Sequence, residues 1–167
     1  ISWARHVTIA GYLLFSSYYA YTKRSQVVVF PDGSIPVNFK RENDLIPMER
    51  TIRHSVVDKM YDLKMDRIQF ALTRSLVALT DAPPDASPKM REIFLTEKSK
   101  SATCLLRYLQ SRHGTQNGLH FFVDTINLIS LLFRRVEVNK SYYAYRACLT
   151  NDIGASRLMA QLLLDQE

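Results

Sequence analysis

Residues 120–135 read HFFVDTINLISLLFRR. Wound as an α-helix, at about 100° per residue, this stretch places its apolar side chains in one broad arc that only Thr125 interrupts. The apolar arc consists of Phe121, Phe122, Ile126, Leu128, Ile129, Leu132 and Phe133. The opposite side consists of His120, Asp124, Asn127, Ser130, Arg134 and Arg135, with Val123 and Leu131 as exceptions. The arc is wider than one neighbour needs and contains no charge, so the stretch predicts a central packing helix and not a catalytic element.

The rest of the composition predicts one packed domain, or part of one. The chain has 167 residues, of which 47% are hydrophobic, and only five Gly and six Pro. Its net charge of +6 is dispersed over short basic pairs, such as Arg134 and Arg135. A solvated basic surface explains this pattern better than a nucleic-acid groove, because no long basic run and no aromatic-glycine motif accompanies it.

The number of cysteines and the length of the apolar stretches indicate the cellular environment of the chain. Cys104 and Cys148 are too few for a disulfide framework or a four-cysteine zinc site, which favours a reduced, intracellular environment. Residues 7–21 are apolar, but they fall short of the roughly 20 residues that a bilayer demands and include several tyrosines. We therefore expect a buried core helix there and no membrane association.

No local motif indicates catalysis. The four histidines are not spaced as metal ligands, and neither cysteine lies beside a histidine. The sequence contains no HExxH, GxSxG, Walker or GxGxxG pattern. We therefore predict no enzyme, no metal and no cofactor.

Apolar spacing and capping residues divide the chain into helices. Asp66 and Gln69 form a capping-box pattern, and Ser87 followed by Pro88 starts another helix. Gly11 is interpreted as a kink or a point of close approach. Helices are predicted over residues 2–22, 48–63, 66–80, 87–111, 141–149 and 155–164, in addition to the opening stretch. A short β-hairpin is predicted over 27–37, with its turn at Pro31, Asp32 and Gly33, and a loop over 113–118.

The last predicted helix has a pattern of its own. Leu158, Met159, Leu162 and Leu163 form one apolar patch, with Gln161 between them. A short amphipathic C-terminal helix of this kind can dock on its own domain and complete a groove for another helix. An ordinary closing helix explains the same pattern equally well.

Several segments, taken together and in order, resemble the ligand-binding domain of nuclear hormone receptors, especially the divergent nematode members. The tetrapeptide SWAR at 2–5 resembles the family's WAK end of its third helix, and Leu13 with Leu14 resembles its fifth. LKMDRIQFAL at 63–72 is similar to the eighth helix, typically LxLDxxEFAL. The Ser87 helix resembles the ninth, His120 with Phe121 the start of the tenth, and residues 158–163 the activation helix.

The resemblance implies an all-α, layered antiparallel helical sandwich with one short β-hairpin. Residues 1–167 would be a partial, N-terminally truncated ligand-binding domain, from the end of the third helix to the activation helix. The family's DNA-binding module is absent from this sequence, so any DNA contact would come through a domain outside it. The implied function is transcription regulation in the nucleus, by binding an apolar small molecule and recruiting coregulators through the C-terminal helix.

The resemblance also assigns candidate sites. The ligand pocket would include Leu14, Tyr18, Tyr21 and Phe30. The groove for a coregulator helix would consist of Arg5, Leu158, Met159, Gln161, Leu162 and Leu163. The surface for a homo- or heterodimer with a nuclear receptor would consist of Phe122, Ile126, Ile129 and Phe133.

Three positions depart from the family pattern. Gln69 and His120 stand where the family pairs Glu with Arg, and losing both charges together can be nearly neutral. We expect these two side chains to lie close together. Gln161 replaces an acid that would face the N-terminus of the coregulator helix, and so brings no charge to it. The departures favour an alternative function, a ligand-independent dimerisation module that modulates other receptors.

Overall fold

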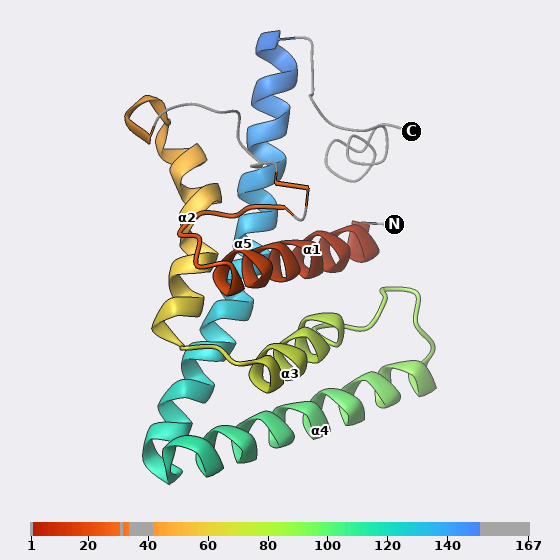
Figure 1. Ribbon diagram of the computed structural model, residues 1–167. Coiled ribbons are helices and arrows are strands. Elements are labelled where there is room, and N and C mark those ends of the chain that lie inside the picture. Colours follow the sequence, from red (N-terminus) through yellow and green to blue (C-terminus); the bar gives the residue numbers. More distant parts are fainter. Residues whose placement is uncertain (1, 31, 34–41, 151–167) are drawn as a thin grey trace.

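The computed structural model describes residues 2–30, 32–33 and 42–150, and these residues form an all-helical domain (Figure 1). The helices are α1 (Ser2–Thr22), α2 (Pro47–Asp62), α3 (Arg67–Ala78), α4 (Pro88–His113) and α5 (Thr115–Thr150), with a short 3-10 turn at Glu42–Asp44. The predicted all-α class is confirmed. The β-hairpin is not confirmed, because residues 27–30 form no strand and residues 34–37 lie outside the described part of the chain.

The five helices form two groups that cross each other. Helices α1, α3 and α4 lie side by side, and α2 and α5 run across them (Figure 1). Helix α5 contacts each of the other four helices. The central place predicted for residues 120–135 is therefore confirmed, while the correspondence to the receptor sandwich stays a prediction.

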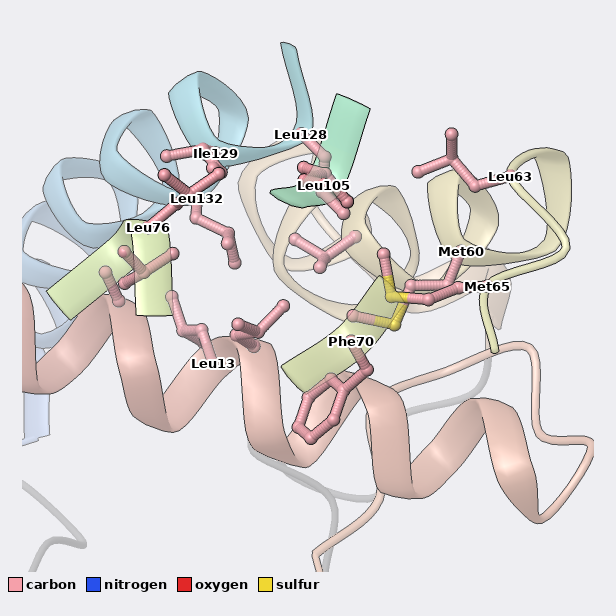
Figure 2. Packing of buried hydrophobic residues seen from close by; sticks show 14 of the residues in the cluster. Leu13, Met60, Leu63, Met65, Phe70, Leu76, Leu105, Leu128, Ile129 and Leu132 are labelled. Atoms are coloured by element: carbon pink, nitrogen blue, oxygen red, sulfur yellow. The ribbon is translucent and has the colours of Figure 1, made fainter. Parts of the chain in front are cut away.

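The main core shows why α5 needs so wide an apolar arc (Figure 2). Leu128 and Leu132 are almost completely buried against Leu13 of α1, Leu76 of α3 and Leu105 of α4. Phe121, Phe122 and Phe133 are partly buried and pack against the same core. Because α5 meets neighbours on several sides, apolar side chains over nearly half of its circumference have a partner.

Helix α5 is longer than predicted at both ends. The loop predicted over 113–118 is wrong, because α4 ends at His113 and α5 begins at Thr115. Gly114 alone makes the turn, with a φ of 82° that favours glycine. The separate helix predicted over 141–149 is the continuation of α5, and no Gly or Pro between residues 119 and 150 would end it.

Gly118, in the first turn of α5, brings two helices together. A Cβ at Gly118 would lie 2.5 Å from the Cα of Gln110. Glycine is therefore required at this position for the backbones of α4 and α5 to approach so closely. At Gly11, in contrast, a Cβ would meet nothing within 4 Å, so the close approach predicted there is wrong.

The C-terminal half of α5 is held by α2. Tyr142 is 2% exposed and packs with Leu45 and Ile52 in a second, smaller core. Its hydroxyl donates to Oε1 of Glu49, which is also buried, over 3.2 Å. This contact explains why α5 continues as a packed helix beyond the main core.

The predicted start of α4 is confirmed. The Oγ of Ser87 accepts a hydrogen bond from the backbone N–H of Met90 over 3.2 Å, and Pro88 occupies the first turn. The middle of the helix, TEKSKS at 96–101, is largely exposed, as its polar character predicts. None of the helices among the described residues is long and apolar enough to cross a membrane.

Candidate functional site

The four predicted ligand-pocket residues have different surroundings in the structure. Leu14 is completely buried in the main core, and Phe30 packs against Tyr12 with 5.4 Å between ring centroids. Tyr21 packs edge-on against Tyr61, with 4.9 Å between centroids. Tyr18 alone of the four lines a cleft of about 680 Å³ between α1 and α3. A ligand pocket built from these residues stays a prediction.

The cleft between α1 and α3 combines aromatic rings with two arginines. Its walls include Phe15, Tyr18 and Tyr19 of α1 and Phe70 of α3, and Arg67 and Arg74 of α3 also line it. Sequence reasoning singled out only Tyr18. The spacing of Arg67, Ala71 and Arg74, at i, i+4 and i+7, was the signal that these residues share one side of α3.

Two rings form a stacked pair in this cleft. The rings of Tyr18 and Phe70 lie nearly parallel, with 3.9 Å between centroids and 10° between planes. Burial, followed by the negative charge of Asp66, raises the pKa of the Tyr18 phenol above its ordinary value. The hydroxyl of Tyr18 is therefore protonated at neutral pH and can donate a hydrogen bond.

The predicted coregulator groove is described at one residue only. Arg5 is half-buried in α1, and Leu158, Met159, Gln161, Leu162 and Leu163 lie outside the described residues. The next residue, His6, lies against α5, where its Nε2 is 2.5 Å from Oε1 of Glu137. The groove stays a prediction.

The predicted dimer surface mixes core and surface residues. Ile129 is 9% exposed and belongs to the core, and Phe122 and Phe133 are partly buried against it. Ile126 is 37% exposed. The outward apolar side chains of this part of α5 are Leu119, Val123 and Ile126, which we call the α5 stripe. Sequence reasoning placed Val123 among the polar residues as an exception, and that exception was the signal for this stripe.

Gln69 meets α5 at Thr125. The side chain of Gln69 is completely buried, and its Nε2 donates to Oγ1 of Thr125 over 2.9 Å. Thr125 in turn donates to the carbonyl oxygen of Phe121. His120 is exposed on α5. The described contact of Gln69 with α5 is thus the one with Thr125, and the expected proximity of Gln69 and His120 stays a prediction. The capping box is also only half formed, since Asp66 caps α3 while Gln69 points into the core.

Substitution of Thr125 by valine is expected to lower the free energy of unfolding by about 1–3 kcal/mol, because the buried Nε2 of Gln69 loses its acceptor. Combining Thr125→Val with Gln69→Met should recover part of this loss, since no polar group is then left unpaired. Urea denaturation of the two single variants and the double variant measures the coupling.

Thr73→Val is the matched control, because the buried hydroxyl of Thr73 bonds only the Gln69 carbonyl within α3. A loss below about 1 kcal/mol is expected for it. Simple additivity of Gln69→Met and Thr125→Val would contradict the contact.

Asp66 ties the start of α3 to the end of α4. Its Oδ1 accepts from the backbone N–H of Gln69 over 2.8 Å, and its Oδ2 lies 2.6 Å from Nη1 of Arg112 and also accepts from the Tyr108 hydroxyl. Burial alone would raise the pKa of Asp66, but the hydrogen bonds from Tyr108 and Gln69, with the charge of Arg112, lower it overall. The hydrogen bond with Asp66, followed by burial, raises the pKa of Tyr108.

This lowered pKa predicts a pH dependence of stability. The ionised form of Asp66 is stabilised by folding, so its contribution is fully present above the ordinary pKa of 3.8 and is lost as the pH falls through the lower folded value. Asp66→Ala should cost about 1–2 kcal/mol at pH 7, largely through the helix cap. Urea denaturation of both proteins from pH 7 to pH 3 should show the difference shrinking at the acidic end.

Asp66→Asn is the control, because Asn also caps helices but carries no charge for Arg112. It should lose less than Asp66→Ala at neutral pH. A stability gap between the native protein and Asp66→Asn that stays constant down to pH 3 would contradict the charge contribution.

The fold defines the class of protein as an all-helical domain built around one long helix, α5. Among the described residues no three His, Cys, Asp or Glu side chains gather as a metal site. Its candidate sites are an aromatic cleft and an outward apolar stripe, both suited to binding.

Comparison with known proteins narrows this class. The chain is 30% identical over 140 residues to nuclear hormone receptor family member nhr-60 of Caenorhabditis elegans, an alignment that covers 83% of this chain and 30% of that protein. It is 21% identical over 145 residues to nuclear hormone receptor family member nhr-154 of the same organism, covering 84% of this chain and 31% of that protein. The chain therefore spans about a third of the length of these relatives. No family model and no solved structure matches. The similarities support a relationship to the nuclear hormone receptors.

Proposed function

We propose that this chain is the regulatory, ligand-binding-type domain of a nuclear receptor transcription factor, which binds an apolar small molecule and recruits coregulators through its C-terminal helix. The observation that carries this proposal is the similarity to two nuclear hormone receptors over more than four fifths of the chain. An all-α fold organised around one long helix is consistent with it. Nuclear localisation follows from the same proposal.

The ligand part of the proposal is tested by native mass spectrometry of the purified chain with a panel of lipids and sterols. A reproducible complex of defined mass, lost when Tyr18 is replaced by alanine, supports it. The matched control is Tyr145→Ala, because Tyr145 is exposed on α5 and does not line the cleft that contains Tyr18. A chain that retains no molecule from the panel argues against ligand regulation.

The alternative function is a ligand-independent dimerisation module, and the α5 stripe favours it. Leu119, Val123 and Ile126 are spaced at i, i+4 and i+7, so they share one side of the helix, and they are 49%, 49% and 37% exposed. Exposed apolar side chains grouped in this way mark protein interaction surfaces. Both functions could use this surface for pairing with a second copy or with another nuclear receptor.

Pairing is tested by sedimentation equilibrium. The native chain should self-associate, and Val123→Glu combined with Ile126→Glu should leave it monomeric, because two charges cannot be buried unpaired in an interface. The control adds the same charge elsewhere, through Ser99→Glu and Thr103→Glu at exposed positions of α4. Equal association of both double variants would contradict pairing through the α5 stripe.

A further inference from the structure

The cleft between α1 and α3 is a groove between two helices that lie side by side (Figure 1). Its aromatic lining comes from Phe15, Tyr18, Tyr19 and Phe70. Phe70 is only 9% exposed and Tyr18 stacks on it, so the main core holds these two rings in place. Phe15 is 49% exposed, which leaves a large apolar side chain without cover. The groove therefore offers a partner an apolar face that the fold has already positioned.

The α3 side of the groove is positively charged. Arg67 and Arg74 both line the groove and are exposed. They are seven residues apart, which is nearly two turns and about 10 Å along the helix axis. No carboxylate lines the groove, and neither arginine forms an ion pair with any of the described residues. A partner with complementary charge therefore carries two acids at about this spacing.

The shape of the groove favours a helix as the element that a partner inserts. A groove between two packed helices accepts the ridge of a third helix. Acids seven residues apart on a helix have the same axial spacing as Arg67 and Arg74, so one helix aligned with α3 meets both arginines. Recognition of an extended strand needs a free strand edge, and the described residues form no strand.

We propose that this groove is a docking surface for an acidic amphipathic helix of a partner protein. The apolar side of that helix covers Phe15 and packs on the rings of Tyr18 and Phe70, and two of its carboxylates bind Arg67 and Arg74. Arginine suits this role because its planar guanidinium offers a carboxylate two parallel N–H donors. The net charge of +6 also favours the approach of an acidic partner.

This docking surface is separate from the groove predicted for coregulators. The coregulator groove is predicted from Arg5 and residues 158–163, and none of these lines the docking surface. Phe15 lies ten residues beyond Arg5 in α1, which is about 15 Å along the helix. Of the predicted ligand-pocket residues, Tyr18 alone lies in it. The inference therefore goes beyond the proposed function and does not depend on it.

The test is a fluorescence-anisotropy titration of the 167-residue chain with a fluorescein-labelled, alanine-based helical peptide. The peptide carries leucines at i, i+4 and i+7, and two glutamates seven residues apart on the flank of that stripe. A matched peptide has glutamine in place of both glutamates. The acidic peptide should bind at least tenfold more tightly than the glutamine peptide, and this difference should shrink as salt is added.

Replacing both arginines, through Arg67→Gln and Arg74→Gln, should remove the difference between the two peptides, because only the charged contacts are lost. The control, Arg50→Gln with Arg107→Gln, removes the same charge from exposed positions on α2 and α4 and should keep the difference. Phe15→Ala should weaken the binding of both peptides, since it removes apolar contact area and leaves the charges in place.

The position of the peptide is tested with photo-leucine in the stripe, followed by mass spectrometry of the cross-linked fragments. Cross-links should fall within residues 15–22 and 67–75, and Leu162→Ala with Leu163→Ala should leave binding unchanged. Absence of binding by the acidic peptide, equal binding of the two peptides, or cross-links confined to other residues would each overturn the proposal.

Two further outcomes would assign the peptide or the groove differently. Loss of peptide binding in the variant with Leu162→Ala and Leu163→Ala would overturn the proposal and assign the peptide to the coregulator groove. Peptide binding that weakens as the chain concentration rises would overturn it too, and would assign the groove to a second copy of the chain.

Discussion

Replacing Leu132 with alanine is expected to lower the free energy of unfolding by about 3–5 kcal/mol, because it leaves a cavity where α5 meets the other helices. The side chain of Leu132 is completely buried in the main core. Domains of this size are stable by only about 5–15 kcal/mol, so a large share of the total would be lost. Urea denaturation followed by circular dichroism measures the change.

The matched control is Leu119→Ala, on the same helix and with the same atoms removed. Leu119 is 49% exposed, so the expected change is within about 0.5 kcal/mol. Comparable losses for Leu119→Ala and Leu132→Ala would mean that α5 buries a different side. Such a result would therefore contradict the assignment of Leu132 to the buried side of α5 and of Leu119 to its exposed side.

Replacing Gly118 with alanine is expected to destabilise the protein by about 2 kcal/mol or more, because a methyl group there overpacks a backbone contact. The added Cβ would lie 2.5 Å from both the Cα and the backbone nitrogen of Gln110 and 2.8 Å from the carbonyl carbon of Leu109. Backbone atoms cannot rotate away as a side chain can, so α4 and α5 must separate. Thermal denaturation should show a lower midpoint.

Gly11→Ala provides the opposite sign in the same protein. Gly11 lies in α1, and an added Cβ meets nothing within 4 Å. Alanine should therefore stabilise the protein by about 0.5–1 kcal/mol, through the lower backbone entropy of the unfolded chain. Stabilisation by both substitutions would show that α4 and α5 are not in close contact at Gly118.

Gly114 and Gly118 show what the sequence could and could not predict. The helix periods, the caps at Asp66 and Ser87 and the central place of residues 120–135 were predicted from local patterns, and the structure has them. The pattern HGTQNG at 113–118 predicted a loop because Gly and polar residues usually form loops. Only the path of α4 in the structure shows that Gly114 makes the turn between α4 and α5. The same path shows that Gly118 lies where the two helices are in contact.

The candidate sites were less predictable than the helices. The apolar arc of residues 120–135 does not say which of its members face the core and which face outward. Packing by four helices buries Ile129 and leaves Ile126 and Val123 exposed. The cleft joins Tyr18 to Arg67 and Phe70, which are far apart in the sequence, so no local pattern could place them together.

The most direct test of the proposed transcriptional role is a reporter assay with the chain fused to an unrelated DNA-binding module. The fusion should change reporter transcription relative to the module alone at equal protein level, and Leu162→Ala with Leu163→Ala should abolish the change. Ser99→Ala with Thr103→Ala, at exposed positions of α4, should leave it intact. Reporter transcription that is the same with the fusion as with the module alone would contradict the regulatory function proposed for this chain.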